Sequence, residues 1–281
     1  MNRIDRYAVV GEQIGHSRSP QIHALFAQAT GQAMQYGLID VAAAGFVAAV
    51  RGFFDAGGCG LNVTVPHKQA ALQLAGTLTP RARRAGAVNT LALRTGGAVP
   101  ELLGDNTDGA GLVRDLKVNL GRALQGERVL LLGAGGGARG VIAPLLESGV
   151  AMLTIHNRHA ERAAQLAQEF ADLGPVRAAP ADTEGTAATA PYGLVINATS
   201  ASLRGELPSL SPGVIGSQTL CYDCAYGEHD TVFVTWARSC GAAEAAMGLG
   251  MLVEQAAESF LLWRGVRPDT APVLAALRRP A

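Results

Sequence analysis

Four polar clusters interrupt the apolar first part of the chain, each where a loop is expected to follow a strand. They are residues 15–20 (GHSRSP), 62–68 (NVTVPHK), 87–90 (AVNT) and 104–109 (GDNTDG). Because buried polar groups need partners, gathered amides and hydroxyls suit a ligand that is itself rich in hydroxyl groups. Lys68 adds an amine and Asp108 a carboxylate. Together the clusters predict a site for a polyhydroxylated small molecule.

Taken singly, each cluster also has a purely structural interpretation. Ser19 suits the N-cap of a helix, and Asp108 could cap the helix that follows it. Asn62 and Thr64 could bond to backbone groups, while Lys68 could be a solvated residue at a helix start. Only the combination of amine, carboxylate, amides and hydroxyls favours a binding site over these alternatives.

A second kind of site is indicated by the glycine turn in VLLLGAGGGAR, residues 129–139. An apolar strand is expected over 129–132 and a helix over 138–148, which is the context in which such a turn binds a dinucleotide. Gly133 permits the tight turn, Gly135 lets the backbone approach a pyrophosphate, and Ala138 allows close packing of helix on strand. The alternative is a tight turn that binds nothing.

The end of the next strand, expected over 151–156, indicates which nucleotide is bound. An NAD site usually places a carboxylate there for the ribose 2′-hydroxyl. This strand is instead followed by Asn157 and Arg158, with Arg162 one helical turn further on. Guanidinium groups favour a 2′-phosphate, so we predict NADP rather than NAD. The alternative is that both arginines are solvated residues of a helix start.

The elements that must position these residues alternate between strand and helix patterns, which predicts an α/β fold with mostly parallel sheets. A domain boundary is expected near 106–108. In the first part we expect strands over 6–11, 35–41, 60–65 and 86–93, and helices over 19–30 and 45–56. In the second part we expect a helix over 109–120, strands over 192–197 and 219–223, a loop or short helix over 178–191, and helices over 248–264 and 268–278.

Composition limits the classes of function. The chain has 281 residues, which suggests two domains, and a formal net charge of zero, which indicates no bulk attraction to nucleic acid or an anionic membrane. No apolar run is long enough for a transmembrane helix, and the start does not resemble a secretion signal, so a cytoplasmic location is expected. Cys221 and Cys224 form a CxxC, but without a second ligand pair we expect small buried thiols and no metal.

The ordered set of motifs resembles the shikimate dehydrogenase family over about residues 7–276. The motifs are HSRSP, NVTVPHK, AVNT, DNTDG, GAGGGARG, HNR, NATS, CYDCAY and GLGMLVEQ. The resemblance implies reversible NADPH-dependent reduction of 3-dehydroshikimate to shikimate, a step of aromatic amino-acid biosynthesis. It also implies a substrate domain over 1–107 plus 253–281, completed by the C-terminal helices, and a Rossmann-type NADP-binding domain over 108–252.

The resemblance also assigns site residues. Lys68 and Asp108 are the expected catalytic pair. The expected substrate-binding residues are Ser17, Ser19, Asn62, Thr64, Asn89, Thr107, Tyr226 and Gln255. The expected NADP(H)-binding residues are Gly133, Ala134, Gly135, Gly136, Gly137, Ala138, Asn157, Arg158, Arg162, Thr199, Gly248 and Met251.

The chemistry of a ketone reduction agrees with this assignment. Negative charge develops on the ketone oxygen, and a lysine ammonium there stabilises it and can donate a proton. Asp108 would keep Lys68 charged and oriented. Two departures from the family pattern are Gln13, where a proline is frequent, and His159, where the turn usually has threonine. Alternative functions are an NAD-dependent quinate or shikimate dehydrogenase and a non-catalytic relative; a monomer or homodimer is expected.

Overall fold

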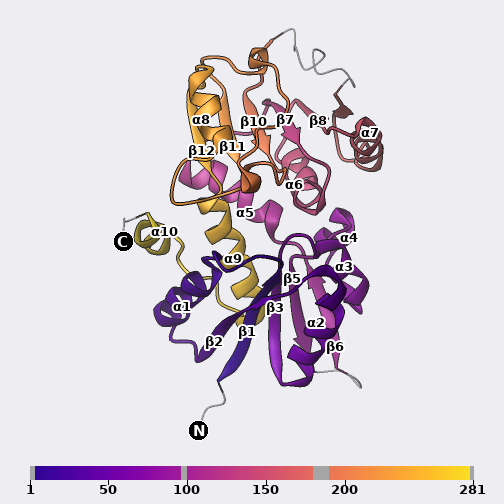
Figure 1. The fold of residues 1–281 in the computed structure, drawn as a ribbon, viewed down its shortest axis with the longest axis vertical. Coiled ribbons are helices and arrows are strands. Elements are labelled where there is room, and N and C mark those ends of the chain that lie inside the picture. Colours follow the sequence, from indigo (N-terminus) through magenta and orange to yellow (C-terminus); the bar gives the residue numbers. More distant parts are fainter. Residues whose placement is uncertain (1–3, 96–99, 180–189, 279–281) are drawn as a thin grey trace. The chain divides into compact units, whose positions relative to one another are not determined.

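The computed structural model describes residues 4–95, 100–179 and 190–278. The chain divides into two compact units. The first comprises Met1–Gly111 and Leu252–Ala281, and the second comprises Leu112–Met251. Both crossings between the units fall inside helices, α5 (Asp108–Arg114) and α9 (Leu249–Arg264). Figure 1 shows a separate sheet in each unit.

The sheet of the first unit has the strand order β2-β1-β3-β5-β6-β4. Its strands are β1 (Asp5–Gly11), β2 (Met34–Asp40), β3 (Gly58–Val63), β4 (Thr77–Leu78), β5 (Thr90–Arg94) and β6 (Glu101–Asp105). β1 runs parallel to β2 and β3, and β4 runs parallel to β6. β5 runs antiparallel to both of its neighbours. This reversal lets β3 and β6 deliver polar residues to opposite sides of Asn89, which directly precedes β5.

Helices cover both faces of this sheet, as the alternation of side chains along β1 requires. Ala8 and Val10 pack with residues of α2 (Phe46–Asp55), α3 (Lys68–Leu74) and α4 (Pro80–Ala85). On the other face Tyr7 contacts Trp263 of α9, with ring centroids 4.7 Å apart. The same face carries α1 (Ser19–Thr30). α1 contacts α10 (Ala271–Leu277), the last helix of the chain.

The second unit has a parallel sheet with the order β12-β11-β10-β7-β8-β9. Its strands are β7 (Arg128–Leu132), β8 (Met152–His156), β9 (Val176–Ala178), β10 (Leu194–Asn197), β11 (Leu220–Asp223) and β12 (Glu244–Met247). Numbered within the unit, this is the 3-2-1-4-5-6 order of a dinucleotide-binding fold. The order reverses between β7 and β10, and ligands of such sheets bind at the carboxyl ends of the strands at that point.

The helices of the second unit are α6 (Gly136–Glu147), α7 (Ala160–Glu169) and α8 (Val232–Ser239). Leu131 and Ile155 of the sheet pack with residues of α6 and α7, whereas Leu130 packs with residues of α8. α5 continues into a π-helical turn, Asp115–Asn119, and short 3₁₀ helices occupy Ala43–Gly45, Ser202–Arg204 and Pro212–Val214. The Rossmann-type fold predicted from the glycine turn is thus present.

Several predicted bounds differ from the structure. The strand expected over 86–93 begins only at Thr90, and the helix expected over 268–278 begins at Ala271. The helix expected over 109–120 changes to π geometry after Arg114. The loop or short helix expected over 178–191 falls mostly outside the described residues, although Ala178 ends β9. The short elements β4, β6, β9, β12, α4 and α8 were not predicted. α3 and α7 were expected only as helix starts, at Lys68 and near Arg158 and Arg162.

The prediction that Ser19 is an N-cap is wrong. Arg18 occupies that position, and its side chain makes no capping bond. Ser19 is the first residue of α1, and its backbone N–H donates to Ser17 Oγ at 3.3 Å. Pro20 lies in the first turn, where its missing N–H costs nothing.

Candidate active site

The centre of the candidate site is an ion pair between Lys68 and Asp108. Each begins a helix, Lys68 at the start of α3 and Asp108 at the start of α5. Lys68 Nζ donates to Asp108 Oδ2 at 2.5 Å, and their side chains are 16% and 6% exposed. The interpretation of Lys68 as a freely solvated residue is therefore wrong. A largely buried ammonium held by a carboxylate is suited to stabilise negative charge on a nearby oxygen.

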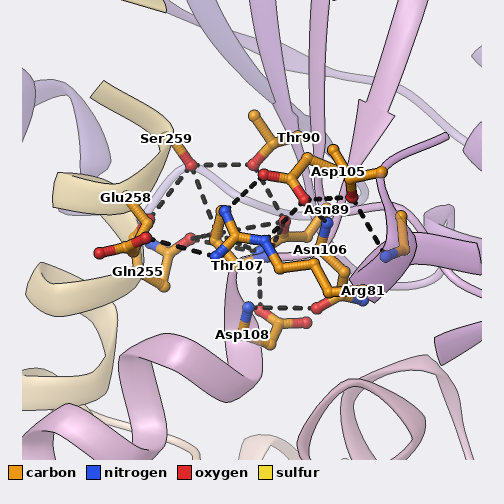
Figure 2. Close-up of polar contacts among 12 residues, drawn as sticks. Arg81, Asn89, Thr90, Asp105, Asn106, Thr107, Asp108, Gln255, Glu258 and Ser259 are labelled. Atoms are coloured by element: carbon orange, nitrogen blue, oxygen red, sulfur yellow. Dashed lines mark hydrogen bonds and ion pairs between the residues drawn. The ribbon is translucent and has the colours of Figure 1, made fainter. Parts of the chain in front are cut away.

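Asn89 holds the second oxygen of the Asp108 carboxylate. Asn89 Nδ2 donates to Asp108 Oδ1 at 2.9 Å and to Thr107 Oγ1 at 2.8 Å. Asn89 Oδ1 accepts from the Thr107 backbone N–H at 2.8 Å. Figure 2 shows these side chains gathered around Asn89. Both carboxylate oxygens of Asp108 thus have a donor, and the orientation of the carboxylate is set from two sides.

Asp108 does not cap its own helix, contrary to the capping alternative. The backbone N–H of Asp108 donates to Asn106 Oδ1 at 3.1 Å, so Asn106 provides the cap. Asn106 Nδ2 in turn donates to the Ala87 carbonyl at 3.0 Å. Because the Asn106 side chain accepts the N–H at the start of α5, the Asp108 carboxylate can bind the Lys68 ammonium.

The buried carboxamide of Asn62 bonds to side chains of the first unit and to the Asn89 carbonyl, the latter at 3.4 Å. Asn62 Nδ2 donates to Ser259 Oγ at 2.8 Å and to Thr90 Oγ1 at 3.1 Å. Asn62 Oδ1 accepts from the Tyr36 hydroxyl at 2.7 Å. The structural alternative, bonding only to backbone, is therefore too simple. Both ends of the amide have protein partners.

α9 contributes two polar side chains one helical turn apart, Gln255 and Ser259 (Figure 2). Gln255 Oε1 accepts from Thr107 Oγ1 at 3.3 Å, while its Nε2 donates to the Leu252 carbonyl at 2.7 Å. Ser259 is fully buried and lies 2.8 Å from Thr90 Oγ1. Thr90 was part of the polar cluster 87–90, but neither Thr90 nor Ser259 was among the predicted site residues. The available signal was a hydroxyl on the apolar stripe of a helix, which needs a partner.

Ser17 lies in the loop before α1, Ser19 is the first residue of α1, and Thr64 lies in the loop after β3. Thr64 directly follows β3, and its methyl group lies close to Gly11, where an added Cβ would approach it to 2.5 Å. Gln13 precedes the serine loop with a φ of 57°, which a proline cannot adopt. Its N–H donates to Asp40 Oδ1 at 2.8 Å, so the departure from the family proline is matched by a bond that proline could not make.

In the second unit the glycine turn lies at the reversal of strand order. Gly133 has a φ of 112°, and a Cβ on it would approach the Ala198 carbonyl oxygen to 3.1 Å and the Thr199 methyl to 3.4 Å. The turn after β7 and the loop after β10 are therefore in contact. Gly135 precedes α6 without a side-chain cap, and an added Cβ would meet nothing within 4 Å. The first N–H groups of α6 and the open space beside them suit a pyrophosphate.

The other predicted cofactor residues also lie in this unit, after the carboxyl ends of its strands. Asn157 follows β8 and accepts the His159 N–H at 2.9 Å, and Arg158 and Arg162 are exposed. Thr199 Oγ1 donates to Asn197 Oδ1 at 2.7 Å. Tyr226 follows β11, and Met251 N–H donates to the Tyr222 hydroxyl at 3.3 Å. Gly248 has no room for a side chain, because a Cβ would lie 2.4 Å from the Cys224 carbonyl oxygen.

A second ion pair, not foreseen from the sequence, anchors the Asp105 end of the site. Arg81 Nε and Nη2 donate to the two oxygens of Asp105, at 2.7 and 2.5 Å, and Arg81 Nη1 reaches Glu258 at 3.3 Å. Thr79 Oγ1 donates to Asp105 at 2.6 Å. Burial raises the pKa of Asp105, but the hydrogen bonds and charge of Arg81 outweigh it and hold the pKa below its usual value.

The cysteines and histidines show no ligand arrangement. All four cysteines are free thiols, and burial raises the pKa of the Cys221 thiol to about 12. Within residues 4–95, 100–179 and 190–278, acidic, cysteine and histidine side chains form no group of three able to hold a metal ion. Over the same residues, every helix is too short or too polar to cross a membrane.

Family models match three segments of the chain. Residues 9–91 match the "Shikimate dehydrogenase substrate binding domain", residues 116–204 match "Shikimate / quinate 5-dehydrogenase", and residues 248–278 match the "Shikimate 5'-dehydrogenase C-terminal domain". Among curated relatives, the shikimate dehydrogenase (NADP(+)) of Alkalilimnicola ehrlichii is 55% identical over 274 residues, 98% of each chain. The enzyme of that name from Hahella chejuensis is 53% identical over 277 residues, 98% of this chain and 99% of that one.

Solved structures share the complete fold. An Ael1 enzyme from Pseudomonas putida has a TM-score of 0.87 at 43% identity, covering 98% of this chain and 99% of that one. Shikimate 5-dehydrogenase from Thermus thermophilus, solved with NADP(H) and shikimate, has a TM-score of 0.85 at 33% identity with the same coverage.

Proposed function

The chain belongs to the shikimate dehydrogenase family, and we propose that it catalyses the reversible NADPH-dependent reduction of 3-dehydroshikimate to shikimate. The observation that carries the mechanism is the Lys68–Asp108 ion pair within a buried set of amides and hydroxyls. This reaction belongs to the biosynthesis of chorismate and the aromatic amino acids.

In the proposed mechanism Lys68 is the acid and base. NADPH, when bound in the second unit, would supply the hydride for the carbonyl carbon of the substrate. As the carbonyl π bond breaks, the Lys68 ammonium transfers a proton to the oxygen, and an alcohol results. In the reverse direction neutral Lys68 takes that proton back. Asp108 holds and aims the ammonium, because its carboxylate accepts a hydrogen bond from Lys68 Nζ at 2.5 Å.

The first unit is proposed as the substrate domain. Ser17 and Ser19 would hold the substrate carboxylate at the start of α1, and Thr64 and Gln255 would bind ring hydroxyls. Asn89 and Thr107 would also bind ring hydroxyls, through the donors and acceptors that their contacts within the protein leave unused. Asn62 has partners at both ends of its amide, so a hydroxyl would have to share its oxygen with Tyr36. Tyr226 is the proposed contact from the second unit.

The second unit is proposed as the NADP-binding domain. Backbone N–H groups at the start of α6 would bind the pyrophosphate, with Gly133 allowing the turn. The Asn157 amide and the exposed guanidinium groups of Arg158 and Arg162 would hold the adenosine 2′-phosphate. Thr199, Gly248 and Met251 are proposed for the nicotinamide end.

An absorbance assay at 340 nm tests the function directly. Shikimate and quinate are each offered with NADP and with NAD, in four mixtures. Turnover of shikimate with NADP, and little in the other mixtures, is the expected result. Turnover of quinate with NAD would instead assign the chain to an NAD-dependent quinate or shikimate dehydrogenase. A folded protein inactive in all four mixtures would favour a non-catalytic relative.

Charge-removing substitutions test the cofactor site. The double variant Arg158→Gln with Arg162→Gln should raise KM for NADP at least tenfold and leave KM for NAD nearly unchanged, because only NADP carries the 2′-phosphate. Arg238→Gln is the matched control, since Arg238 is an exposed arginine of the same unit paired with Asp230. An equal rise for both nucleotides would reject the assignment of the arginines.

The monomeric or homodimeric state and the cytoplasmic location stay predictions. Light scattering of the eluting protein would measure the oligomeric state, and cell fractionation would measure the location.

A further inference from the structure

A chain of hydrogen bonds leads from the partly buried Tyr36 to the Lys68–Asp108 ion pair. The Tyr36 hydroxyl donates to Asn62 Oδ1 at 2.7 Å, and Asn62 Nδ2 donates to Thr90 Oγ1 at 3.1 Å. Thr90 Oγ1 donates to Asn89 Oδ1 at 2.9 Å, and Asn89 Nδ2 donates to Asp108 Oδ1 at 2.9 Å. In each of these hydrogen bonds the donor is therefore on the side of Tyr36 and the acceptor on the side of the Asp108 carboxylate.

The direction of this chain follows from one unambiguous donor. The Thr107 backbone N–H can only donate, and it lies 2.8 Å from Asn89 Oδ1. The carboxamide of Asn89 must then present its NH₂ group to Asp108. With the oxygen of Asn89 facing Thr90, the Thr90 hydroxyl has to donate to it, and its lone pairs remain for Asn62. The Thr90 hydroxyl therefore connects two buried amides, because it accepts from Asn62 and donates to Asn89.

The Thr90 hydroxyl lies in a buried position, where loss of a hydrogen bond affects its neighbours. Its side chain is fully buried at the first residue of β5, and it lies 2.8 Å from the equally buried Ser259 of α9 (Figure 2). Removal of the hydroxyl takes one of three donors from Asn89 Oδ1, which leaves only the two donors of Thr107 on that oxygen. It also takes one acceptor from Asn62 Nδ2. Bonds in such a network also strengthen one another.

We propose that Thr90 is a positioning residue of the reaction. Its hydroxyl acts together with the Thr107 backbone N–H to hold the Asn89 amide in place. Asn89 orients the Asp108 carboxylate, and Asp108 aims the Lys68 ammonium at the substrate oxygen. Thr90 acts only through Asn89 and is not a catalytic residue. The proposal rests on the proposed function for its kinetic consequence, but the geometry that it describes can be measured without substrate.

The kinetic test compares Thr90→Val, which keeps the shape but loses the hydroxyl, with Thr90→Ser, which keeps the hydroxyl. We expect Thr90→Val to lower kcat for shikimate about tenfold with KM changed by less than about threefold, because an orienting group is displaced and binding contacts remain. Thr90→Ser should restore kcat to within about twofold of the parent. Thr154→Val is the control, since Thr154 is a buried strand threonine of the second unit.

A spectroscopic test uses an unusual feature of the composition. Lys68 and Lys117 are the only lysines in the sequence. A ¹H–¹⁵N correlation of the lysine ammonium groups therefore contains two signals, and Lys117→Arg assigns them. In the parent protein the Lys68 signal should persist, because its protons are held by Asp108 and exchange slowly. In Thr90→Val it should broaden, and in Thr90→Ser it should return.

The outcomes separate the two proposals. If the parent protein does not turn over shikimate but the Lys68 signal responds to Thr90→Val, the proposed function fails and the positioning role stands. If kcat and the Lys68 signal are both unchanged in a folded Thr90→Val protein, the positioning role is rejected. Equal impairment of Thr90→Ser and Thr90→Val also rejects it, because the hydroxyl would then not matter.

Discussion

Lys68 and Asp108 are forty residues apart in the sequence, yet the ammonium of one lies 2.5 Å from the carboxylate of the other. Each is the first residue of its helix, so both side chains start from backbone that β3 and β6 deliver to the same edge of the sheet. Between those strands lies β5, preceded by Asn89, which bonds to Asp108. The antiparallel insertion of β5 is what places an amide beside the ion pair.

Removal of the ammonium should abolish most of the catalytic rate. For Lys68→Ala we expect kcat to fall by about 10²–10⁴ and KM for shikimate to stay within a few-fold, because the interaction is strongest when charge develops on the oxygen. Steady-state kinetics at 340 nm measures both. Lys117→Ala is the control, since Lys117 is exposed in the π-helical turn. A large rise of KM with kcat intact would mean that Lys68 only binds substrate.

An alanine at the glycine turn should damage the second unit. Gly133 has a φ of 112°, and a Cβ would lie 3.1 Å from a backbone oxygen, so Gly133→Ala should lower the free energy of unfolding by about 2 kcal/mol and weaken NADP binding. Gly52→Ala in α2 meets no atom within 4 Å and should be neutral or stabilising. Urea unfolding and NADP titration measure the effects. Unchanged stability and affinity in Gly133→Ala would contradict the strained turn.

Acid should weaken the anchor formed by Asp105. The folded-state pKa of Asp105 is lowered, so its stabilising effect is complete above the unfolded pKa, near 4, and is lost as the pH falls through the folded pKa. Asp105→Asn should cost about 2 kcal/mol of unfolding free energy at pH 7, because Arg81 loses its bidentate carboxylate partner and keeps only Glu258. The cost should shrink toward pH 2. In contrast, Asp230→Asn in an exposed pair should cost little at any pH. A pH-independent cost for Asp105→Asn would point to lost packing alone.

A second acid effect is expected from His23. Burial lowers its folded-state pKa to about 3, and its ring stacks on Tyr36 with centroids 4.1 Å apart. Below pH 6.5 His23 is protonated in the unfolded chain but stays neutral in the folded protein. The free energy of unfolding therefore falls by about 1.4 kcal/mol per pH unit until the folded-state pKa is reached. His23→Phe keeps the stacking and should flatten this dependence between pH 6 and 4. If urea unfolding of His23→Phe shows the parent slope, the titration of His23 is not its cause.

Local patterns were enough to predict much of the second unit. The apolar run of β7, the glycines after it and the helix of α6 are contiguous, so sequence alone predicts the turn and its ligand class. The arginines after β8 are equally local and favour NADP. Chemical type indicated an amine and a carboxylate among the polar loops, and the family resemblance paired them as Lys68 and Asp108. The structure shows their ion pair, and their catalytic role stays a prediction.

The contacts inside the first unit depended on tertiary structure. No spacing shows that Asn89 holds Asp108, that Asn106 replaces Asp108 as the cap, or that Thr90 joins two amides. Ser259 comes from a helix some 170 positions later, and Arg81 finds Asp105 only when α4 packs beside β6. Periodicity reports which residues share a face of an element, whereas the partner of a buried polar group is decided by which other element packs against that face. For this protein, sequence alone therefore predicted the type of chemistry. Packing in the tertiary structure determined which side chains hold Lys68 and Asp108 in position.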